Sequence, residues 1–501
     1  MQFSEYIQHD ATALAQLVRA GEVSAAELLQ CAQQQSARVN SKTNAVCRNM
    51  HVQAHTQLQA LPLNAPFAGV PFLLKDGSQH YAGVPTSYGS RSMIGFTPAE
   101  HSHVVRRYLE SGLVVFGKTN LPEFALKSVT DSQLWGPTSN PWDLSRTAGG
   151  SSGGAAAAVA SGVVPMAAAT DGGGSIRIPA SYCGLFGLRP SRGRVSSGPE
   201  LGEVWSGASS HGVISRSVRD TATALDALQG AMPGDPFQIP PPLIPYAQAM
   251  RQEPGKLRIG YTMQSPIGTP VDPQAVAAVS HAVVVLRSLG HDVEESAPHV
   301  DGQALAMSYL HMYFGHMHLA TQEARRAGAS RRDFELLTRI LAILGETTSS
   351  GVFVRECNAW NTYARALGKF HSQWDLLLTP TVAKPAPLHG AGDLPALQQW
   401  ALTLLERSGL FALLARAGLL DSVIAQIARD SLAFVPFTQL SNLTGTPSMS
   451  VPLHSTPQGL PMGVQFVAGF GQEDLLFKLA NQLEMTQPWS MKLPKWIFAA
   501  T

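Results

Sequence analysis

The chain has 501 residues, a formal net charge of +1 and only 14% charged residues. The near-neutral charge argues against a general electrostatic attraction to nucleic acid or to an anionic membrane surface. The low charged fraction, against about 25% in average soluble domains, excludes a disordered chain and predicts a large buried core.

The cysteines and the N-terminus point to one compartment. Four cysteines are scattered without metal-finger spacing, which favours free thiols in a reducing environment. The first residues lack the basic and apolar segments of a secretory signal, and no run of about 18 strongly apolar residues predicts a membrane span. We therefore expect a cytoplasmic protein with no membrane span and no nucleic-acid partner.

The N-terminal half predicts alternating helices and strands. Residues 10–40 predict two helices, and the apolar run 70–74 predicts a buried strand with Lys75 at its end. A helix over 103–110 and a strand over 113–116, ended by Gly-Lys, follow. This alternation predicts an α/β fold in which helices cover a central mixed β-sheet.

The C-terminal half is richer in predicted helix. In chain order the patterns predict a proline-rich loop at 240–245, a strand at 256–261, a helix at 274–288, mostly helix over 302–372, a strand at 376–380, mostly helix over 393–430, paired strands at 448–453 and 462–468, and a helix at 474–483. No repeat and no linker divides the chain. We expect one large domain with a helical insertion.

Two serines lie in glycine-rich turns. The first turn reads Gly-Gly-Ser-Ser-Gly-Gly at 149–154, and the second reads Thr-Asp-Gly-Gly-Gly-Ser-Ile-Arg at 170–177. Glycine lets backbone N–H groups approach a ligand closely, and successive N–H groups can form an anion-binding concavity. A flexible linker is the alternative. The helix-forming and apolar segments on both sides argue against it, because linkers lie at the surface.

The first turn can be compared with two common motifs. It matches the nucleophile elbow G-x-S-x-G, which needs a strand before it and a helix after it. A helix is predicted over 155–161, but residues 145–147 do not form a strand by pattern. A phosphate-binding loop would need a lysine where Ala155 stands, so nucleotide binding is disfavoured.

A third interpretation joins both turns to Lys75. A buried lysine that is neutral can act as a base, and burial supplies pKa shifts of the size required. Ser151 would then relay a proton between Lys75 and Ser175. The N–H groups of Gly172, Gly173, Gly174 and Ser175 would bind the oxyanion of a tetrahedral intermediate. The alternative for Lys75 is an ordinary surface lysine.

Short motifs in a fixed order carry a family resemblance. They lie at 69–76, 117–120 with Glu123, 140–141, 149–154, 171–179, 216–220, 378–381, 442–447 and 459–465. With them the chain resembles the amidase signature family over nearly its whole length. The stretches 140–146 and 178–184 look most like its 6-aminohexanoate cyclic dimer hydrolase branch. Ile178 departs from the Ser-Ile-Arg-Gln-Pro usual in glutaminyl-tRNA amidotransferase subunits, which weakens a tRNA-linked role.

The resemblance implies a Ser–cis-Ser–Lys triad. Ser175 would be the acyl-forming nucleophile, Ser151 the relay after a cis Gly150–Ser151 peptide, and Lys75 the general base. Asp171 and Arg177 match positions that support the glycine loop. No metal or organic cofactor is implied.

The resemblance also bears on the domain and the pocket. It implies one amidase domain over 1–501, with a signature core over about 66–220 and a mostly helical variable region over about 300–430. The family often carries a larger residue at position 172, so Gly172 predicts a looser or larger acyl side of the pocket. The stretch 123–130 is expected to border the pocket. The leucine-rich stretch 410–420 is expected to be core, or else a dimer surface or a lid.

The leading hypothesis is an amidohydrolase that cleaves a small, cyclic, aryl or aliphatic amide, 6-aminohexanoate oligoamides included, through an acyl-enzyme on Ser175. Its partner would be the small-molecule amide, and a homodimer is compatible with it. The alternatives are a promiscuous esterase or carbamate hydrolase with the same triad, an esterase with a histidine-based triad, and a non-catalytic amidotransferase-like subunit.

Overall fold

The strand that ends at Lys75 forms where the apolar run predicts it. The computed structural model describes residues 1–498, except for the side chains at 421, 427 and 428. In it, β2 (Pro71–Lys75) is buried along its whole length and pairs in parallel with β3 (Val114–Thr119). β1 (Val46–Asn49) completes this sheet as the antiparallel neighbour of β3.

The prediction that Gly-Lys at 117–118 ends its strand is wrong. Both residues lie inside β3, and β1 approaches the strand closely there. A side chain at Gly117 would place its Cβ 2.8 Å from the carbonyl oxygen of Arg48. The glycine therefore permits strand pairing at this point, rather than breaking the strand.

A second, larger sheet forms the centre of the molecule. Its strand order is β12-β11-β13-β15-β14-β9-β10-β8. β11 pairs in parallel with β12 and β13, and the remaining pairs are antiparallel, so the predicted central mixed sheet is confirmed. The strands are β8 (Met166–Asp171), β9 (Phe186–Arg189), β10 (Ser210–Ser215), β11 (Arg258–Tyr261), β12 (Asp292–Glu295), β13 (Leu376–Pro380), β14 (Ser448–Ser455) and β15 (Pro461–Ala468).

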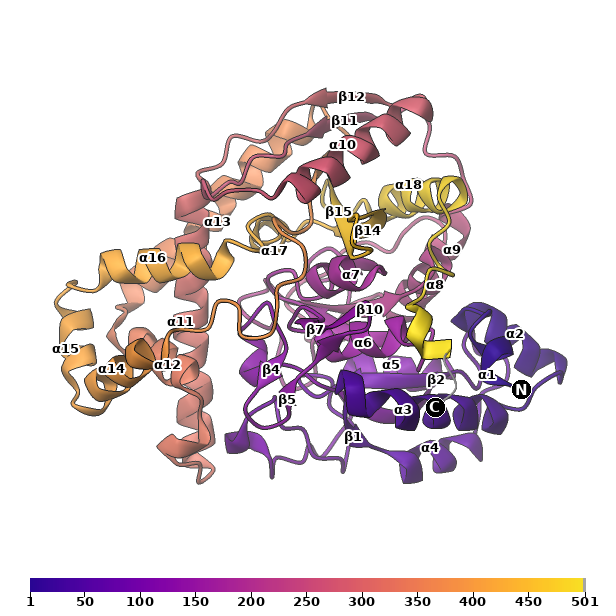
Figure 1. Ribbon diagram of the computed structural model, residues 1–501, viewed down its shortest axis with the longest axis horizontal. Coiled ribbons are helices and arrows are strands. Elements are labelled where there is room, and N and C mark those ends of the chain that lie inside the picture. The colour runs from indigo at the N-terminus through magenta and orange to yellow at the C-terminus, as the bar shows by residue number, and fades with distance from the viewer. Residues whose placement is uncertain (499–501) are drawn as a thin grey trace.

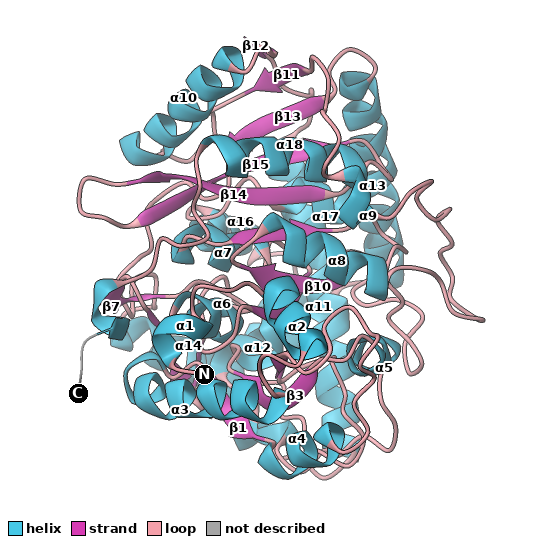
Figure 2. Cartoon of the chain, turned by 90° about the vertical axis from the view of Figure 1, so that its right-hand side faces the viewer, coloured by secondary structure: helices cyan, strands magenta, loops and turns pink. Residues whose placement is uncertain are grey.

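Helices flank the stack of strands, which runs in Figure 2 from β12 at the top to β1 at the bottom. They are α1 (Phe3–Tyr6), α2 (Ala11–Ala20), α3 (Ala25–Thr43), α4 (His51–Leu58), α5 (His103–Glu110), α6 (Gly153–Ala160), α7 (Arg177–Cys183), α8 (Val218–Leu228), α9 (Tyr246–Ala249), α10 (Pro273–Ser288), α17 (Gln439–Thr444) and α18 (Glu473–Thr486). Every residue of α6 and α7 is buried. These two helices carry the glycine turns at their N-termini, so both turns lie deep in the core.

The smaller elements connect these layers. They are the strands β4 (Asp131–Ser132), β5 (Gly136–Pro137), β6 (Ser139–Asn140) and β7 (Asp143–Thr147), and the 3₁₀ turns η1 (Arg91–Met93), η2 (Glu123–Ala125), η3 (Arg331–Asp333) and η4 (Lys495–Phe498). None of the helices within residues 1–498 is both long enough and apolar enough to cross a bilayer.

The predicted helical region projects to one side of the sheet, at the left of Figure 1. It contains α11 (Gly302–Arg326), α12 (Leu336–Thr347), α13 (Ser350–His371), α14 (Ala396–Arg407), α15 (Leu410–Arg416) and α16 (Asp421–Leu432). The expectation that 410–420 is core holds only for Phe411, which packs against Phe314 and Leu344. Leu413 is 64% exposed because α15 buries only one face, and Leu419, in the turn after α15, is 66% exposed.

Candidate active site

Lys75 is buried at the end of β2, and three hydroxyl groups surround its side-chain nitrogen. The residue is 1% exposed. Nζ lies 2.8 Å from Ser151 Oγ, 2.9 Å from Ser152 Oγ and 2.9 Å from Thr170 Oγ1. Burial lowers the pKa of Lys75 from its usual 10.5 to about 7, although the charge of Asp171 opposes the shift. Lys75 is therefore not a surface lysine, and a large fraction of it is neutral near pH 7.

Ser151 lies in the turn between β7 and α6. The expectation that 145–147 is not a strand is wrong, because these residues belong to β7, in which Thr147 pairs with Ser139 of β6. The strand–turn–helix context of a nucleophile elbow is therefore present. In the described residues, however, no hydrogen bond joins a histidine to Ser151, and a histidine base is what an elbow serine requires. The peptide bond between Gly150 and Ser151 is cis, as the resemblance implies.

The glycines of the first turn allow neighbouring backbone to approach it. A Cβ at Gly150 would lie 2.6 Å from the carbonyl oxygen of Val129, and a Cβ at Gly154 would lie 2.4 Å from the backbone nitrogen of Asn120. Thr130 Oγ1 donates to Gly149 O at 2.9 Å. The stretch 123–130 thus contacts the turn that carries Ser151.

Ser151 and Ser152 are equally close to Lys75 but differ in their other partners. The Ser152 hydroxyl donates to Thr170 O at 3.3 Å, so its proton is already used. Within the described residues, the Ser151 hydroxyl has Lys75 as its hydrogen-bonding partner and no other. A neutral amine keeps one lone pair, and of the two adjacent serines Ser151 is the one whose hydroxyl proton is free to be donated to it.

The second glycine turn joins β8 to α7 and is held by a buried ion pair. Arg177 NH2 lies 2.8 Å from Asp171 Oδ1, and both side chains are fully buried. Burial alone would raise the pKa of Asp171, but the charge and hydrogen bonds of Arg177 outweigh burial and hold that pKa well below its usual range. Asp171 is therefore a permanent anion inside the core.

Segments from the end of the chain complete this ion pair. Arg177 donates to Thr438 O at 2.9 Å, to Asn442 Oδ1 at 2.7 Å and to Gln465 Oε1 at 2.6 Å. Asn442 and Gln465 belong to the two C-terminal motifs seen in the sequence. These motifs therefore fix the glycine turn, which explains why they accompany it.

The amides of the second turn are unequally available. Gly174 N–H donates to Asp171 Oδ1 at 2.8 Å, so this amide is not free for an oxyanion, contrary to the sequence-based expectation. In the described residues, the N–H groups of Gly172, Gly173 and Ser175 have no protein acceptor. Thr438 Oγ1 donates to Gly173 O at 2.6 Å and fixes the orientation of that peptide unit. Three amides thus remain unpartnered beside the Ser175 side chain.

The helix that follows Ser175, α7, packs against the first turn. Ser175 is 8% exposed, and a Cβ at Gly149 would lie 3.0 Å from Cα of Pro179, four positions after Ser175. No hydrogen bond joins the hydroxyls of Ser151 and Ser175 among the described residues. Catalytic hydrogen bonds are often long before substrate binds.

Several residues of the site have no individual prediction from sequence. Thr170 contacts Lys75, Thr438 contacts Gly173, and the rings of Trp205 and Tyr309 cover Gly172 and Gly173. Thr170 could have been found, because it precedes Asp171 in the second turn. Trp205 comes from a segment without a motif, and only the fold brings it to the glycines.

Comparison with known proteins agrees with the family resemblance seen in the sequence motifs. The model of the family described as Amidase matches residues 27–408 and 420–477. A 6-aminohexanoate-cyclic-dimer hydrolase of Paenarthrobacter ureafaciens is 36% identical over 499 residues, which cover 97% of this chain and 96% of that protein.

Two solved structures share the fold over nearly the whole chain. The structure of a 6-aminohexanoate cyclic dimer hydrolase complexed with substrate superposes with a TM-score of 0.89 and 33% identity, covering 98% of this chain and 99% of the other. A bacterial aryl acylamidase of the amidase signature enzymes gives a TM-score of 0.82 and 25% identity, covering 96% and 97%. The helical region 302–432 is therefore largely shared, although the Amidase match omits 409–419.

Proposed function

The chain belongs to the amidase family and is an amidohydrolase of the amidase-signature type, and from that premise we propose that it cleaves its amide through an acyl-enzyme on Ser175. The observation that carries the proposal is the 2.8 Å contact between Ser151 Oγ and a buried Lys75 whose pKa is about 7. Serine is a weak nucleophile until a base removes its proton, and this contact supplies a base.

Proton transfer begins at neutral Lys75. Its lone pair takes the Ser151 proton while Ser151 takes the proton of Ser175, whose oxygen attacks the amide carbon. The second serine is needed because Lys75 contacts Ser151, Ser152 and Thr170 but not Ser175 among the described residues. Ser152 is not the relay, because its hydroxyl already donates to Thr170 O.

The negative charge of the tetrahedral intermediate falls on the former carbonyl oxygen. The N–H groups of Gly172, Gly173 and Ser175 are the donors for it. One such donor is worth about 3–4 kcal/mol of transition-state stabilisation where it has been measured. The Asp171–Arg177 pair holds the loop in place, and so the donors need little reorganisation during the reaction.

Collapse of the intermediate returns the proton. Lysine, now protonated, gives its proton through Ser151 to the leaving nitrogen, and the C–N bond breaks. Water then attacks the ester formed on Ser175, with the same pair acting as base. The products are a carboxylic acid and an amine.

The substrate class comes from the relatives. One relative is named for the 6-aminohexanoate cyclic dimer and another solved neighbour is an aryl acylamidase. We therefore assign this chain small amides of aliphatic acids, with cyclic 6-aminohexanoate amides as the first compounds to test.

The test is a trapped acyl-enzyme. Wild-type protein is mixed with an excess of the 6-aminohexanoate cyclic dimer or with an acylated aniline, quenched in acid within the first turnovers, and digested for mass spectrometry. An acyl adduct on Ser175, absent from Ser175→Ala, is expected. An adduct on Ser151, or turnover that survives Ser175→Ala, would contradict the assignment.

Turnover and labelling measurements with related compounds and variants separate the alternatives. Faster turnover of the matching esters or carbamates than of amides would favour the esterase interpretation with the same triad. A histidine variant that loses all turnover while Lys75→Ala keeps it would favour a histidine-based triad. Absence of any adduct with amides, esters and a fluorophosphonate would favour a non-catalytic subunit.

A further inference from the structure

Gly172 is a glycine because a tryptophan ring occupies the place of its side chain. A Cβ at this position would lie 2.3 Å from Cζ3 and 2.4 Å from Cε3 of Trp205. The backbone of Gly172 does not have a left-handed φ, so its conformation alone would accept other residues. The expectation that a third glycine enlarges the acyl side of the pocket is therefore wrong, because Trp205 takes up that room.

Trp205 belongs to a continuous aromatic surface along the oxyanion loop. Its ring centroid lies 4.7 Å from that of Tyr313, and the Tyr313 hydroxyl lies 2.6 Å from the Tyr309 hydroxyl. A Cβ at Gly173 would lie only 1.7 Å from the Tyr309 hydroxyl oxygen. Burial raises the pKa of both tyrosines, so both remain neutral. We call Trp205, Tyr309 and Tyr313 the aromatic wall.

The backbone holds Trp205 in an unusual conformation. Trp205 and Ser206 have φ values of 55° and 52°, in the left-handed region that non-glycine residues rarely adopt, so the surroundings must impose this conformation. Ala208 N donates to Trp205 O at 2.9 Å, and Ser206 Oγ lies 3.1 Å from His316 Nε2 of α11. The turn is therefore fastened both to itself and to the helix that carries the tyrosines.

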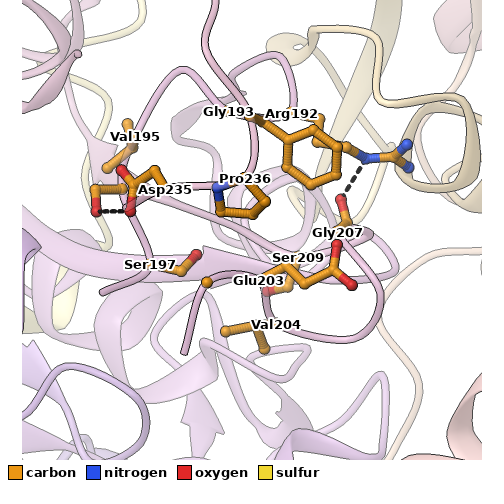
Figure 3. Close-up of a pocket in the computed structure, with 13 residues that line it drawn as sticks. Arg192, Gly193, Val195, Ser197, Glu203, Val204, Gly207, Ser209, Asp235 and Pro236 are labelled. Carbon is orange, nitrogen blue, oxygen red and sulfur yellow. Dashed lines mark hydrogen bonds between the residues drawn. The ribbon is translucent and has the colours of Figure 1, made fainter. Parts of the chain in front are cut away.

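The other side of this turn is anchored as well. Arg192 Nε donates to Gly207 O at 2.7 Å, the bond drawn in Figure 3, and Arg192 NH2 donates to Leu443 O at 2.9 Å. Figure 3 shows that Val204, Gly207 and Ser209, which flank Trp205 in the chain, line a surface pocket. Neighbours of Trp205 in the chain thus line this pocket, while the Trp205 ring itself packs against Gly172.

We propose that Trp205 determines which acyl groups the enzyme accepts, and that it selects slender acyl chains over branched or aromatic ones. The inference rests on the proposed function, in which Gly172 N–H binds the carbonyl oxygen of the substrate. The acyl carbon then lies beside Gly172, and the group it carries must pass along the aromatic wall. A ring this close to Gly172 narrows the space beside the acyl carbon, so a methylene chain passes it more easily than a branched or aromatic group.

The test compares wild type, Trp205→Ala, Gly172→Ala and the double variant. The substrates are anilides of one amine that carry hexanoyl, pivaloyl or benzoyl groups, and kcat/KM is measured for each. Trp205→Ala is expected to raise the pivaloyl-to-hexanoyl and benzoyl-to-hexanoyl ratios by about tenfold or more, the size of effect that one buried group exerts in a pocket. Trp205→Leu gives a smaller shift in the same direction and serves if the alanine variant fails to fold.

The glycine supplies the reciprocal measurement. Gly172→Ala is expected to lower kcat/KM for hexanoyl anilide by about tenfold or more, and the double variant is expected to recover most of that loss, because the ring that meets the new methyl group is gone. Trp400→Ala on α14, where the indole is 62% exposed, is the matched control and should leave the ratios unchanged.

The outcomes separate this inference from the function on which it rests. Unchanged acyl ratios in Trp205→Ala and Trp205→Leu, or a double variant no better than Gly172→Ala, would overturn the role of Trp205 while Ser175 still becomes acylated. No acyl adduct on Ser175 of the wild type would overturn the proposed function and this inference together.

Discussion

Lys75 Nζ lies 2.8 Å from Ser151 Oγ although 76 positions separate the two residues in the chain. The contact joins the end of β2 to the turn before α6, and both lie in the core. A lysine in such a place loses hydration without a carboxylate in direct contact, and this loss lowers its pKa. Burial of Lys75 therefore lowers the stability of the fold, but it keeps the amine neutral and available as a base.

The first prediction concerns pH. Because protonation removes the lone pair of Lys75, kcat/KM should rise with pH below about 7 and reach a plateau above it. Lys75→Ala should lose about 100-fold to 10,000-fold in kcat/KM. The measurement is a pH–rate profile with an anilide whose chemical step limits the rate.

Lys118 provides the comparison for this profile. It is also buried, with a pKa lowered by burial to about 8, but it donates to Pro85 O and Thr86 Oγ1. If kcat/KM instead rises near pH 8 and this rise disappears in Lys118→Gln, the titrating group is Lys118 and the prediction for Lys75 is wrong. A flat profile through neutral pH would show that no group with the pKa of Lys75 serves as base.

The second prediction separates two adjacent serines. Ser151→Ala should lower kcat/KM by about 100-fold or more, because the relay is lost. Ser152→Ala should lower it by about tenfold or less, because hydrogen bonds to Lys75 and Thr170 are lost but the proton relay is kept. The two variants are matched in size and in distance to Lys75. Equal losses of kcat/KM in the two variants would contradict the assignment of Ser151, and not Ser152, as the proton relay.

The local setting of Lys75 and of both serines could be predicted because their motifs are local, whereas their roles in a Ser–cis-Ser–Lys triad came only from the family resemblance. Lys75 ends an apolar run, and both serines lie in glycine turns directly before a helix. The strands and helices with clear periodicity were also predicted, among them β13 and α10. Short-range pattern suffices where the neighbours in space are neighbours in the chain.

The remaining features depend on distant contacts and could not be predicted. Whether the Gly174 amide is free depends on where the Asp171 carboxylate turns, and Asn442 and Arg177 decide that. The expectation that Gly172 enlarges the acyl side of the pocket was wrong for the same reason, because Trp205 comes from another segment of the chain. A glycine motif indicates that another group packs closely against the backbone, but it does not identify that group.

The third prediction concerns the buried ion pair. Asp171→Asn leaves the Arg177 charge buried without its counter-ion, which should cost about 3–5 kcal/mol of unfolding free energy. The measurement is urea unfolding at neutral pH. Asp171→Asn combined with Arg177→Met should cost less than the sum of the single changes.

An exposed pair is the control for this cost. Arg416 and Glu346 lie 3.0 Å apart but are 61% and 51% exposed, so Glu346→Gln should change the unfolding free energy by less than about 1 kcal/mol. Equal effects of Asp171→Asn and Glu346→Gln would contradict the view that burial makes the Asp171 pair essential.

The fourth prediction concerns Glu335, which fastens the helical region to the loop beside the active site. Its Oε1 accepts from Gln133 N at 2.7 Å, and its own N–H donates to Glu123 Oε2 at 2.8 Å. Burial raises the pKa of Glu335 from 4.5 to about 7, and Glu123 adds to the shift. The folded protein thus binds this proton more tightly than the unfolded chain.

The sign of the pH effect follows from that difference. The stabilisation from the bound proton is complete below about pH 4.5 and is lost as pH rises through about 7, by at most about 3 kcal/mol. Glu335→Gln keeps an acceptor for Gln133 and carries no charge. Its unfolding free energy relative to wild type should therefore increase between about pH 5 and about pH 8. Urea unfolding at both values measures this, with Glu323→Gln on the exposed face of α11 as control. A difference that stays constant with pH would show that Glu335 is ionised with an ordinary pKa.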